Sequence, residues 1–356
     1  MASLAHFCQS SVFQIAISKG SLIDWLSVFS RLLLIKTYNI PQPKDENELT
    51  SGVKTAKSFL ADFPNDPRLV KVAYDIGQSY EKLGWSSEAI SAYRDYIKQE
   101  LPEFEQADSL SDEYKIDESP AELFHELKMS ATYKIGKILF AQKEYTEAIE
   151  IWNQYISQFP NGPKWTEAQQ GIVNAEFKIG VELVAEKKYD EAIQTWDEFL
   201  EKHPLDSRSR QIMFIYGQIY FHKEDYQKAI AEWEKLVNKY PGTEESSLAL
   251  FRIGKTYEEK LGSLDKALES YRKLNWGSWE RQAKERIKAM TEKNLRLVTE
   301  RIFRTNETAK VKVSLRNIEK LTVNLYKLDL EAYWRKMHLI RGVENLDIAL
   351  IAPDKT

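Results

Sequence analysis

Catalysis would need a nucleophile, a general base or a set of metal ligands at short spacing, and the sequence offers none of these. The five histidines are scattered, with no H-E-x-x-H pattern and no second histidine at ligand spacing. They are His6, His125, His203, His222 and His338. A glycine-rich phosphate loop and a G-x-S-x-G turn are also missing. Adjacent acids such as Glu244 and Glu245 are typical of solvated faces. We therefore expect a protein that is not an enzyme and that uses no cofactor and no metal.

The remaining reactive side chains are predicted to be structural. Cys8 is the single cysteine, which excludes an internal disulfide and a cysteine-based zinc site. His203 directly precedes Pro204 at a predicted helix end, where the helix dipole favours a cation.

Recognition of a partner without covalent chemistry is suggested by residues that return at fixed distances from a recurring glycine. Three residues before the glycine stands an aromatic: Tyr74, Tyr133, Phe177, Phe214 and Phe251. One residue after it, in four of the five cases, stands a long polar side chain: Gln78, Lys137, Gln218 and Lys255. Aromatic anchors suit an extended or helical peptide. The alternative is that five aromatics in one register pack against the neighbouring repeat.

A repeated unit must position these residues. A glycine precedes an alanine by twelve residues in four places and by thirteen in a fifth. The pairs are Gly77/Ala89, Gly136/Ala148, Gly180/Ala192, Gly217/Ala229 and Gly254/Ala267. An aromatic follows each alanine by four residues, and a proline ends most units. Each unit is therefore predicted to be two helices that cross at small residues, the second with one apolar face.

This placement of glycine, tyrosine, alanine and proline resembles the tetratricopeptide repeat family, whose period is about 34 residues. The resemblance implies a mainly α fold, a solenoid of helical hairpins, over residues 47–275. In that family, the positions three before and one, four and five after the glycine face an inner groove. The resemblance thus implies that these aromatic and polar residues line a groove that binds a protein or peptide.

The glycine spacing departs from this period in two places. Gly136 and Gly180 are 44 residues apart, and the seven residues beyond a 37-residue repeat are assigned to a longer first helix within 161–177. Gly77 and Gly136 are 59 apart. That surplus falls on the acidic stretch 104–123, which is predicted to be a solvated insertion between repeats.

Residues 1–46 form an apolar N-terminal segment whose role stays open. Asp24 and Arg31 interrupt its longest apolar run, which disfavours a membrane span, and a first basic residue at position 19 fits a signal peptide poorly. The segment is predicted to be either a first amphipathic helix stacked on the array or a poor leader. Association with a membrane stays open as well.

The pattern changes after residue 275. Residues 276–300 predict one long charged helix that caps the array and links it to a β region. AKVKVSLR (309–316) and LTVNLYKL (321–328) alternate with period two, which predicts strands, and NLDIALI (345–351) predicts a third. Three strands bury too little surface to be stable alone. We therefore expect residues 301–356 to be the start of a β-sandwich that is incomplete here and continues in a longer protein.

Residues 301–342 resemble the first macroglobulin-type β domain of bacterial alpha-2-macroglobulin-like proteins. The resemblance lies in RxxRTNE, then LRN, YKLDLE and YxRKMH. Complete members are large envelope or secreted proteins that trap proteases, many through a Cys-Gly-Glu-Gln thioester. In this chain Cys8 is followed by Gln-Ser-Ser, so neither a thioester nor a bait region can be placed on these residues.

Charge and resemblance together give two hypotheses of function. Residues 44–290 carry a net charge of −10, which argues against nucleic acid as a ligand. The leading hypothesis is an interaction scaffold that forms the N-terminal part of an alpha-2-macroglobulin-like protein, with any protease bound through the downstream part. The alternative is a structural envelope scaffold that mediates assembly or self-association. The resemblance favours the cell envelope, the periplasm or secretion.

Overall fold

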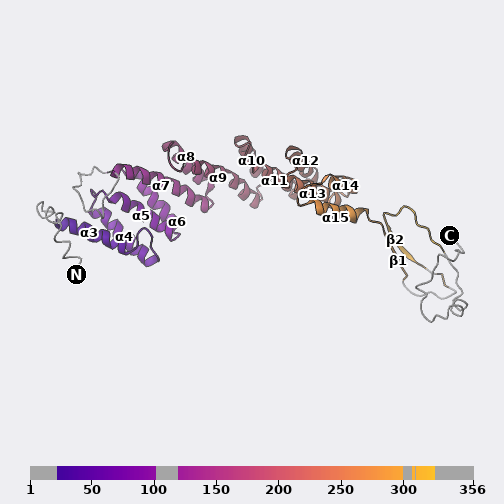
Figure 1. Ribbon diagram of the computed structural model, residues 1–356, viewed down its shortest axis with the longest axis horizontal. Coiled ribbons are helices and arrows are strands. Elements are labelled where there is room, and N and C mark those ends of the chain that lie inside the picture. The colour runs from indigo at the N-terminus through magenta and orange to yellow at the C-terminus, as the bar shows by residue number, and fades with distance from the viewer. Residues whose placement is uncertain (1–21, 102–118, 300–306, 309, 325–356) are drawn as a thin grey trace. The chain divides into compact units, whose positions relative to one another are not determined.

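The computed structural model describes residues 22–101, 119–299, 307–308 and 310–324 (Figure 1). These residues form thirteen helices, α3 to α15, and one two-stranded sheet. The chain divides into two compact units, residues 1–206 and 207–356. The first unit contains α3 to α10, and the second contains α11 to α15 and the sheet. The predicted mainly helical repeat fold is therefore confirmed.

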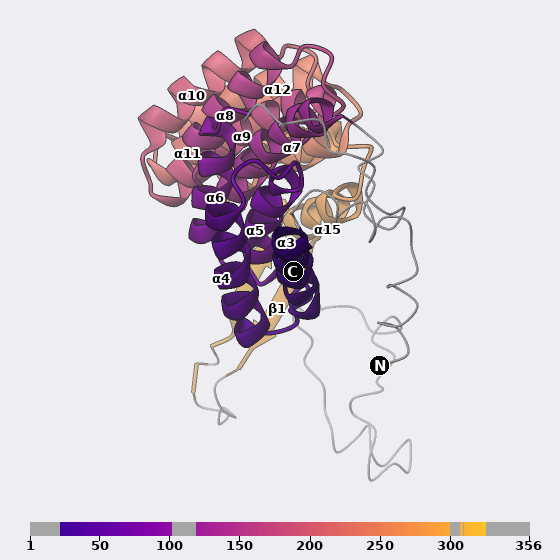
Figure 2. The same ribbon diagram turned by 90° about the vertical axis from the view of Figure 1, so that its left-hand side faces the viewer.

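In the first unit each helix packs on the next one along the chain. Figure 2 shows α4, α5 and α6 side by side. The helices are α3 (Leu22–Thr37), α4 (Glu46–Asp62), α5 (Leu69–Lys82), α6 (Ser86–Lys98), α7 (Pro120–Ala141), α8 (Tyr145–Gln158), α9 (Trp165–Ala185) and α10 (Tyr189–Lys202).

The N-terminal segment contributes a helix to the array. Helix α3 packs on α4, and Arg31 of α3 pairs with Asp62 of α4 at 3.2 Å. Residues 22–37 are thus the first of the two predicted alternatives, a helix stacked on the array, while residues 1–21 lie outside the described part. None of the described helices is long and apolar enough to cross a membrane.

Two first helices of repeats are longer than the others. Helix α9 has 21 residues against 14 in α11, which confirms that the seven extra residues lengthen this helix. Helix α7 has 22 residues and starts at a capping box, in which Ser119 and Glu122 each bond the other's backbone. The acidic insertion predicted over 104–123 therefore extends too far at its C-terminal end, because residues 120–123 belong to α7. Residues 104–118 lie outside the described residues.

The second unit continues the pattern and then leaves it. Its helices are α11 (Ser209–His222), α12 (Tyr226–Lys239), α13 (Glu244–Glu259), α14 (Leu264–Lys273) and α15 (Glu280–Thr291). Its strands are β1 (Asn294–Val298) and β2 (Lys312–Arg316). Helix α15 packs on α14, so it covers the end of the last repeat, as a capping helix must.

Each recurring glycine lies against the aromatic side chain that follows its alanine by four residues. A Cβ placed on Gly77 would lie 2.6 Å from Cδ1 of Tyr93, and one placed on Gly217 would overlap the indole of Trp233. Real Cβ atoms essentially never come so close, and the alanines themselves are fully buried. The small residues are therefore required by the close crossing of the two helices of each repeat.

The single helix predicted over 276–300 is wrong in its second half. Helix α15 ends at Thr291, and Asn294–Val298 pairs antiparallel with Lys312–Arg316. The alternation of Leu295 and Leu297 with polar residues fits a strand, and both pair across the sheet with apolar residues of β2.

The other strand predictions have mixed outcomes. The strand predicted over 309–316 is confirmed at Lys312–Arg316. Residues 321–324 form no strand, and 325–328 and 345–351 lie outside the described residues. With one two-stranded sheet described, the macroglobulin-like β-sandwich stays a prediction.

Candidate functional site

The aromatic residues that precede each glycine by three belong to the core of their own repeat. Tyr74, Phe177 and Phe251 are buried, while Tyr133 and Phe214 are half-buried. Each packs on the aromatic four residues after the alanine of the same repeat, with ring centroids 5.6–6.5 Å apart. Three of the five predicted anchors thus have little surface to offer a ligand. Tyr74 and Phe251 also contact residues beyond their own repeat, Ser130 and Trp279, as the alternative expected.

The repeats fall into two kinds according to that partner aromatic. In three repeats it is tryptophan, whose Nε1 donates to the backbone oxygen of the residue three before the glycine. These bonds join Trp152 to Tyr133 (3.3 Å), Trp196 to Phe177 (3.1 Å) and Trp233 to Phe214 (3.0 Å). In the other two repeats it is tyrosine, whose hydroxyl needs a different acceptor. We call these tryptophan repeats and tyrosine repeats.

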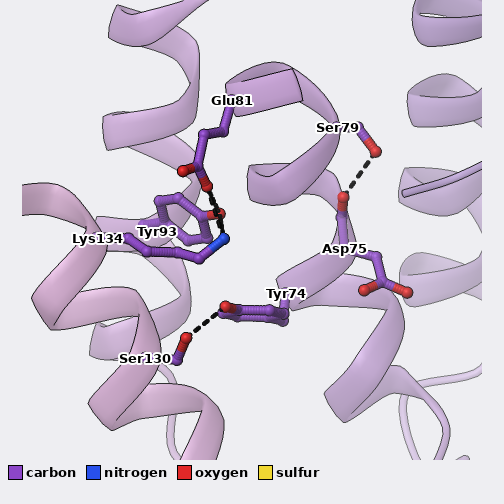
Figure 3. Close-up of polar contacts among 7 residues, drawn as sticks. All are labelled: Tyr74, Asp75, Ser79, Glu81, Tyr93, Ser130 and Lys134. Carbon is purple, nitrogen blue, oxygen red and sulfur yellow. Dashed lines mark hydrogen bonds and ion pairs between the residues drawn. The ribbon is translucent and has the colours of Figure 1, made fainter. Parts of the chain in front are cut away.

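The first tyrosine repeat contains a polar cluster between α5, α6 and α7 (Figure 3). The hydroxyl of Tyr93 donates to Oε2 of Glu81 at 2.7 Å, and Nζ of Lys134 donates to the same oxygen at 2.7 Å. Lys134 Nζ also lies 5.6 Å from the ring centroid of Tyr93. Burial and then the bond to Glu81 raise the pKa of Tyr93, so the phenol stays protonated.

Two further polar contacts surround this cluster. Tyr74 Oη and Ser130 Oγ lie 2.6 Å apart, which joins α5 to α7 (Figure 3). Asp75 is buried and points away from Glu81 in the same view, and its carboxylate pairs with Lys71. Burial raises the pKa of Asp75, and the ammonium of Lys71 opposes that shift.

The second tyrosine repeat builds the same arrangement from other residues. Tyr271 of α14 donates to Oε2 of Glu258 at 2.9 Å, and Nε of Arg286 in α15 donates to the same oxygen at 3.1 Å. Burial and then the bond to Glu258 raise the pKa of Tyr271. In both tyrosine repeats, a glutamate four residues after the glycine binds a phenol of its own repeat and a cation from a helix beyond that repeat.

One cavity of about 580 Å³ lies along α7 in the first unit. A stripe of α7 residues lines it together with Tyr155 and the two residues before α9, Pro163 and Lys164. The stripe includes Tyr133 and Lys137, which were both predicted to face a groove. Lys134 also lines it, so the cavity adjoins the polar cluster of Figure 3. Three lysines and one glutamate line the cavity, Lys134, Lys137, Lys164 and Glu126.

A second cavity, of about 320 Å³, lies in the second unit between α11 and α13. We call it the α11–α13 cavity. Its lining residues are Gln218, Phe221, His222, Trp233, Arg252, Lys255, Thr256, Glu259 and Lys260. Two of these, Gln218 and Lys255, were predicted groove residues. The structure therefore brings these two polar positions of consecutive repeats into one cavity.

Some cavity residues were missed, although the repeat pattern held a signal for them. Phe221 follows its glycine by four residues and His222 by five, positions that the family resemblance already assigns to the groove. Arg252 and Lys260 carry no such signal, because they reach the cavity only through the way α13 packs beside α11. Gln78, the remaining polar prediction, is half-buried on α5 and lines neither cavity.

Of the three histidines in the described part of the chain, two have structural surroundings, and His222 lines the α11–α13 cavity. His203 caps the C-terminal end of α10, and its Nε2 lies 2.6 Å from Oε2 of Glu176, in agreement with the predicted structural role. His125 packs edge-on against Phe159. Among the described residues, no group of three histidine, cysteine, aspartate or glutamate side chains is placed to hold a metal ion.

Comparisons with known proteins address the repeats. Models of the tetratricopeptide repeat match residues 70–100, 130–162, 177–244 and 248–275. No protein with a curated description matches the sequence.

Solved structures with similar helical repeats are distant in sequence. "MamA 41-end from Desulfovibrio magneticus RS-1" is 17% identical and covers 60% of this chain and 96% of its own, with a TM-score of 0.29. The "TPR2AB-domain:pHSP90-complex of yeast Sti1" is 12% identical and covers 73% of this chain and 97% of its own, also with a TM-score of 0.29. At such scores neither structure bears on the partner of this chain.

Proposed function

Because residues 70–100, 130–162, 177–244 and 248–275 are tetratricopeptide repeats, we propose that this chain is a protein-interaction scaffold that binds a protein or peptide segment along the grooves between its first helices. One observation carries the proposal. Four of the predicted groove residues, Tyr133, Lys137, Gln218 and Lys255, line cavities large enough for side chains of a ligand.

A photo-crosslinking amino acid tests this function directly. We would place it at Gln218, inside the α11–α13 cavity, and in a matched variant at Glu234, an exposed position on α12. A scaffold that binds through the groove gives a crosslinked partner from position 218 in cells of the source organism and none from position 234. Equal labelling from both positions, or no adduct from position 218, would contradict groove binding.

The further assignment, to the N-terminal part of an alpha-2-macroglobulin-like protein, is supported by the resemblance of residues 301–342 and by the sheet that α15 leads into. Protease trapping would then belong to downstream residues. The reading frame of the source gene past codon 356 tests this assignment. Further β domains with a bait region support it, and a frame without them contradicts it.

The alternative, a structural envelope scaffold, is favoured by one surface. Leu295, Leu297, Val313 and Leu315 form two cross-strand pairs on one face of the sheet, and all four are exposed. Such a face suits an assembly contact. Fractionation of the source cells tests the envelope, periplasmic or secreted location that the resemblance favours, and sedimentation of the purified chain tests self-association. A monomer at all concentrations would remove this alternative.

A further inference from the structure

The α11–α13 cavity has the composition of a site for one class of ligand. We propose that it binds a protein segment in which an aromatic side chain stands next to carboxylates. This inference rests on the proposed function and names the ligand for one of its two cavities.

The charged side chains that line the cavity are mostly cations. Arg252, Lys255 and Lys260 line the cavity against one acid, Glu259. Lys255 and Glu259 form an ion pair at 3.6 Å. Within the described part of the chain, Arg252 and Lys260 have no carboxylate partner. The cavity therefore holds two positive charges that a ligand carboxylate can neutralise.

The floor of the cavity is aromatic. Trp233 is almost fully buried beneath it, and its Nε1 already donates to the backbone oxygen of Phe214, so the indole supports the floor and leaves no polar group free toward the cavity. Phe221 is half-buried beside it, with ring centroids 6.1 Å apart. Because aromatic rings prefer offset or edge-to-face contacts of this range, a ligand ring can continue the stack. A cavity of about 320 Å³ is at the lower end for ligand sites and suits a single large side chain.

A cation lies close to the aromatic floor, so the cavity can contact a ring and a carboxylate of one ligand at the same time. Nζ of Lys260 lies 5.9 Å from the ring centroids of both Phe221 and Tyr226. A ligand ring near Phe221 would therefore place its neighbouring carboxylate close to Lys260. The side-chain amide of Gln218 makes no hydrogen bond within the described residues, so it can pair with a ligand backbone. These groups match a protein segment, which offers carboxylate, ring and amide together.

The difference between tyrosine and tryptophan repeats explains why the residue four after the glycine can contact a ligand in this repeat. In both tyrosine repeats, the residue four after the glycine is a glutamate whose carboxylate is already bound by a phenol and a cation. Phe221 occupies the same position in a tryptophan repeat and has no such partner, because the indole bonds the backbone instead. Phe221 thus gives this cavity an apolar wall where a tyrosine repeat has a neutralised carboxylate.

The experiment uses the full chain and three labelled pentapeptides as probes: Glu-Glu-Trp-Glu-Glu, Lys-Lys-Trp-Lys-Lys and Glu-Glu-Ala-Glu-Glu. Fluorescence anisotropy should show binding of the first peptide and at least tenfold weaker binding of the other two. The double substitution Arg252→Ala and Lys260→Ala should weaken binding of the first peptide at least tenfold. The matched control, Lys273→Ala with Lys284→Ala, removes two exposed lysines that form only pairs within their own helix, and it should leave binding unchanged.

Equal binding of the acidic and basic peptides would overturn the proposal, and so would unchanged binding after loss of Arg252 and Lys260. No binding of any peptide would overturn it as well. The two experiments distinguish failure of this proposal from failure of the proposed function. If position 218 gives a crosslinked partner but the peptide experiment fails, the chain is a scaffold that binds a different ligand. Thermal melting of each variant shows that a loss of binding does not come from unfolding.

Discussion

The hydroxyl of Tyr93 lies 2.7 Å from Oε2 of Glu81, and the same pairing returns between Tyr271 and Glu258 at 2.9 Å. Where tryptophan replaces the tyrosine, the residue at the glutamate position is apolar, as in Phe140, Val184 and Phe221. The two positions therefore vary together. A buried phenol needs an acceptor outside the helix backbone, whereas an indole N–H reaches a backbone carbonyl of its own repeat.

We predict that Tyr93→Phe lowers the free energy of unfolding by about 1–2 kcal/mol, because it removes a hydrogen bond to a charged group that is partly exposed. A double-mutant cycle with Glu81→Gln should give a coupling energy of about 1 kcal/mol. Urea titration measures both. Tyr80→Phe is the matched control, since its hydroxyl makes no hydrogen bond within the described residues and the ring stacks on Trp85 either way. Additive effects of the first two substitutions would mean that the bond contributes nothing.

Gly217→Leu should lower the free energy of unfolding by about 3 kcal/mol or more, because even a Cβ at this position overlaps the ring of Trp233. Gln211→Leu adds the same side chain at an exposed position of the same helix and should change stability little. Trp233→Leu in the Gly217→Leu background should recover part of the loss. Thermal melting compares the three, and an unchanged melting temperature for Gly217→Leu would refute the close crossing.

The buried carboxylate of Asp75 makes stability depend on pH. Since burial raises its folded pKa above the unfolded value, its stabilising contribution is present below about pH 3.9 and is lost as the pH rises through the folded pKa. Asp75→Asn should therefore raise the melting temperature at pH 7, and the gain should disappear toward pH 4. Asp95→Asn, at an exposed position on α6, should show no such dependence. A gain in melting temperature that increases as the pH falls would contradict a raised pKa of Asp75.

Asn317 should hold the sheet to the end of α15. Its side-chain nitrogen donates to the backbone oxygens of Met290 (2.7 Å) and Glu292 (3.0 Å), and its own φ is 56°. Asn317→Gly keeps that left-handed conformation and removes both bonds. Amide hydrogen exchange in β1 and in the last turn of α15 should then become faster. Ser314→Gly, in the strand that Asn317 follows, tests whether the loss of any side chain has this effect, and equal acceleration by both would show that Asn317 has no special role.

The repeats were predictable because their landmarks are local. Glycine, alanine and the aromatic recur at fixed spacing, so the helix pairs and their crossing at the small residues follow from sequence alone, whereas the contact of the ring with each glycine comes from the structure. Strand β1 was missed because five residues of alternation come directly after a charged helix, and only pairing with β2 distinguishes the two periods. The cations at Glu81 and Glu258 were missed for a similar reason. Lys134 is 53 residues from Glu81, and only the stacking of helices brings them together.

The tyrosine repeats determine where the chain can be truncated without removing a partner of a buried group. A chain ended after Leu274 would keep Tyr271 and Glu258 but lose Arg286, and would leave the carboxylate and the phenol without their cation. A chain ended after Lys239 stops behind a tryptophan repeat, whose indole bond to Phe214 is complete within the repeat. Tyrosine repeats therefore need a successor, and that dependence gives the array a direction in which it can be extended or trimmed.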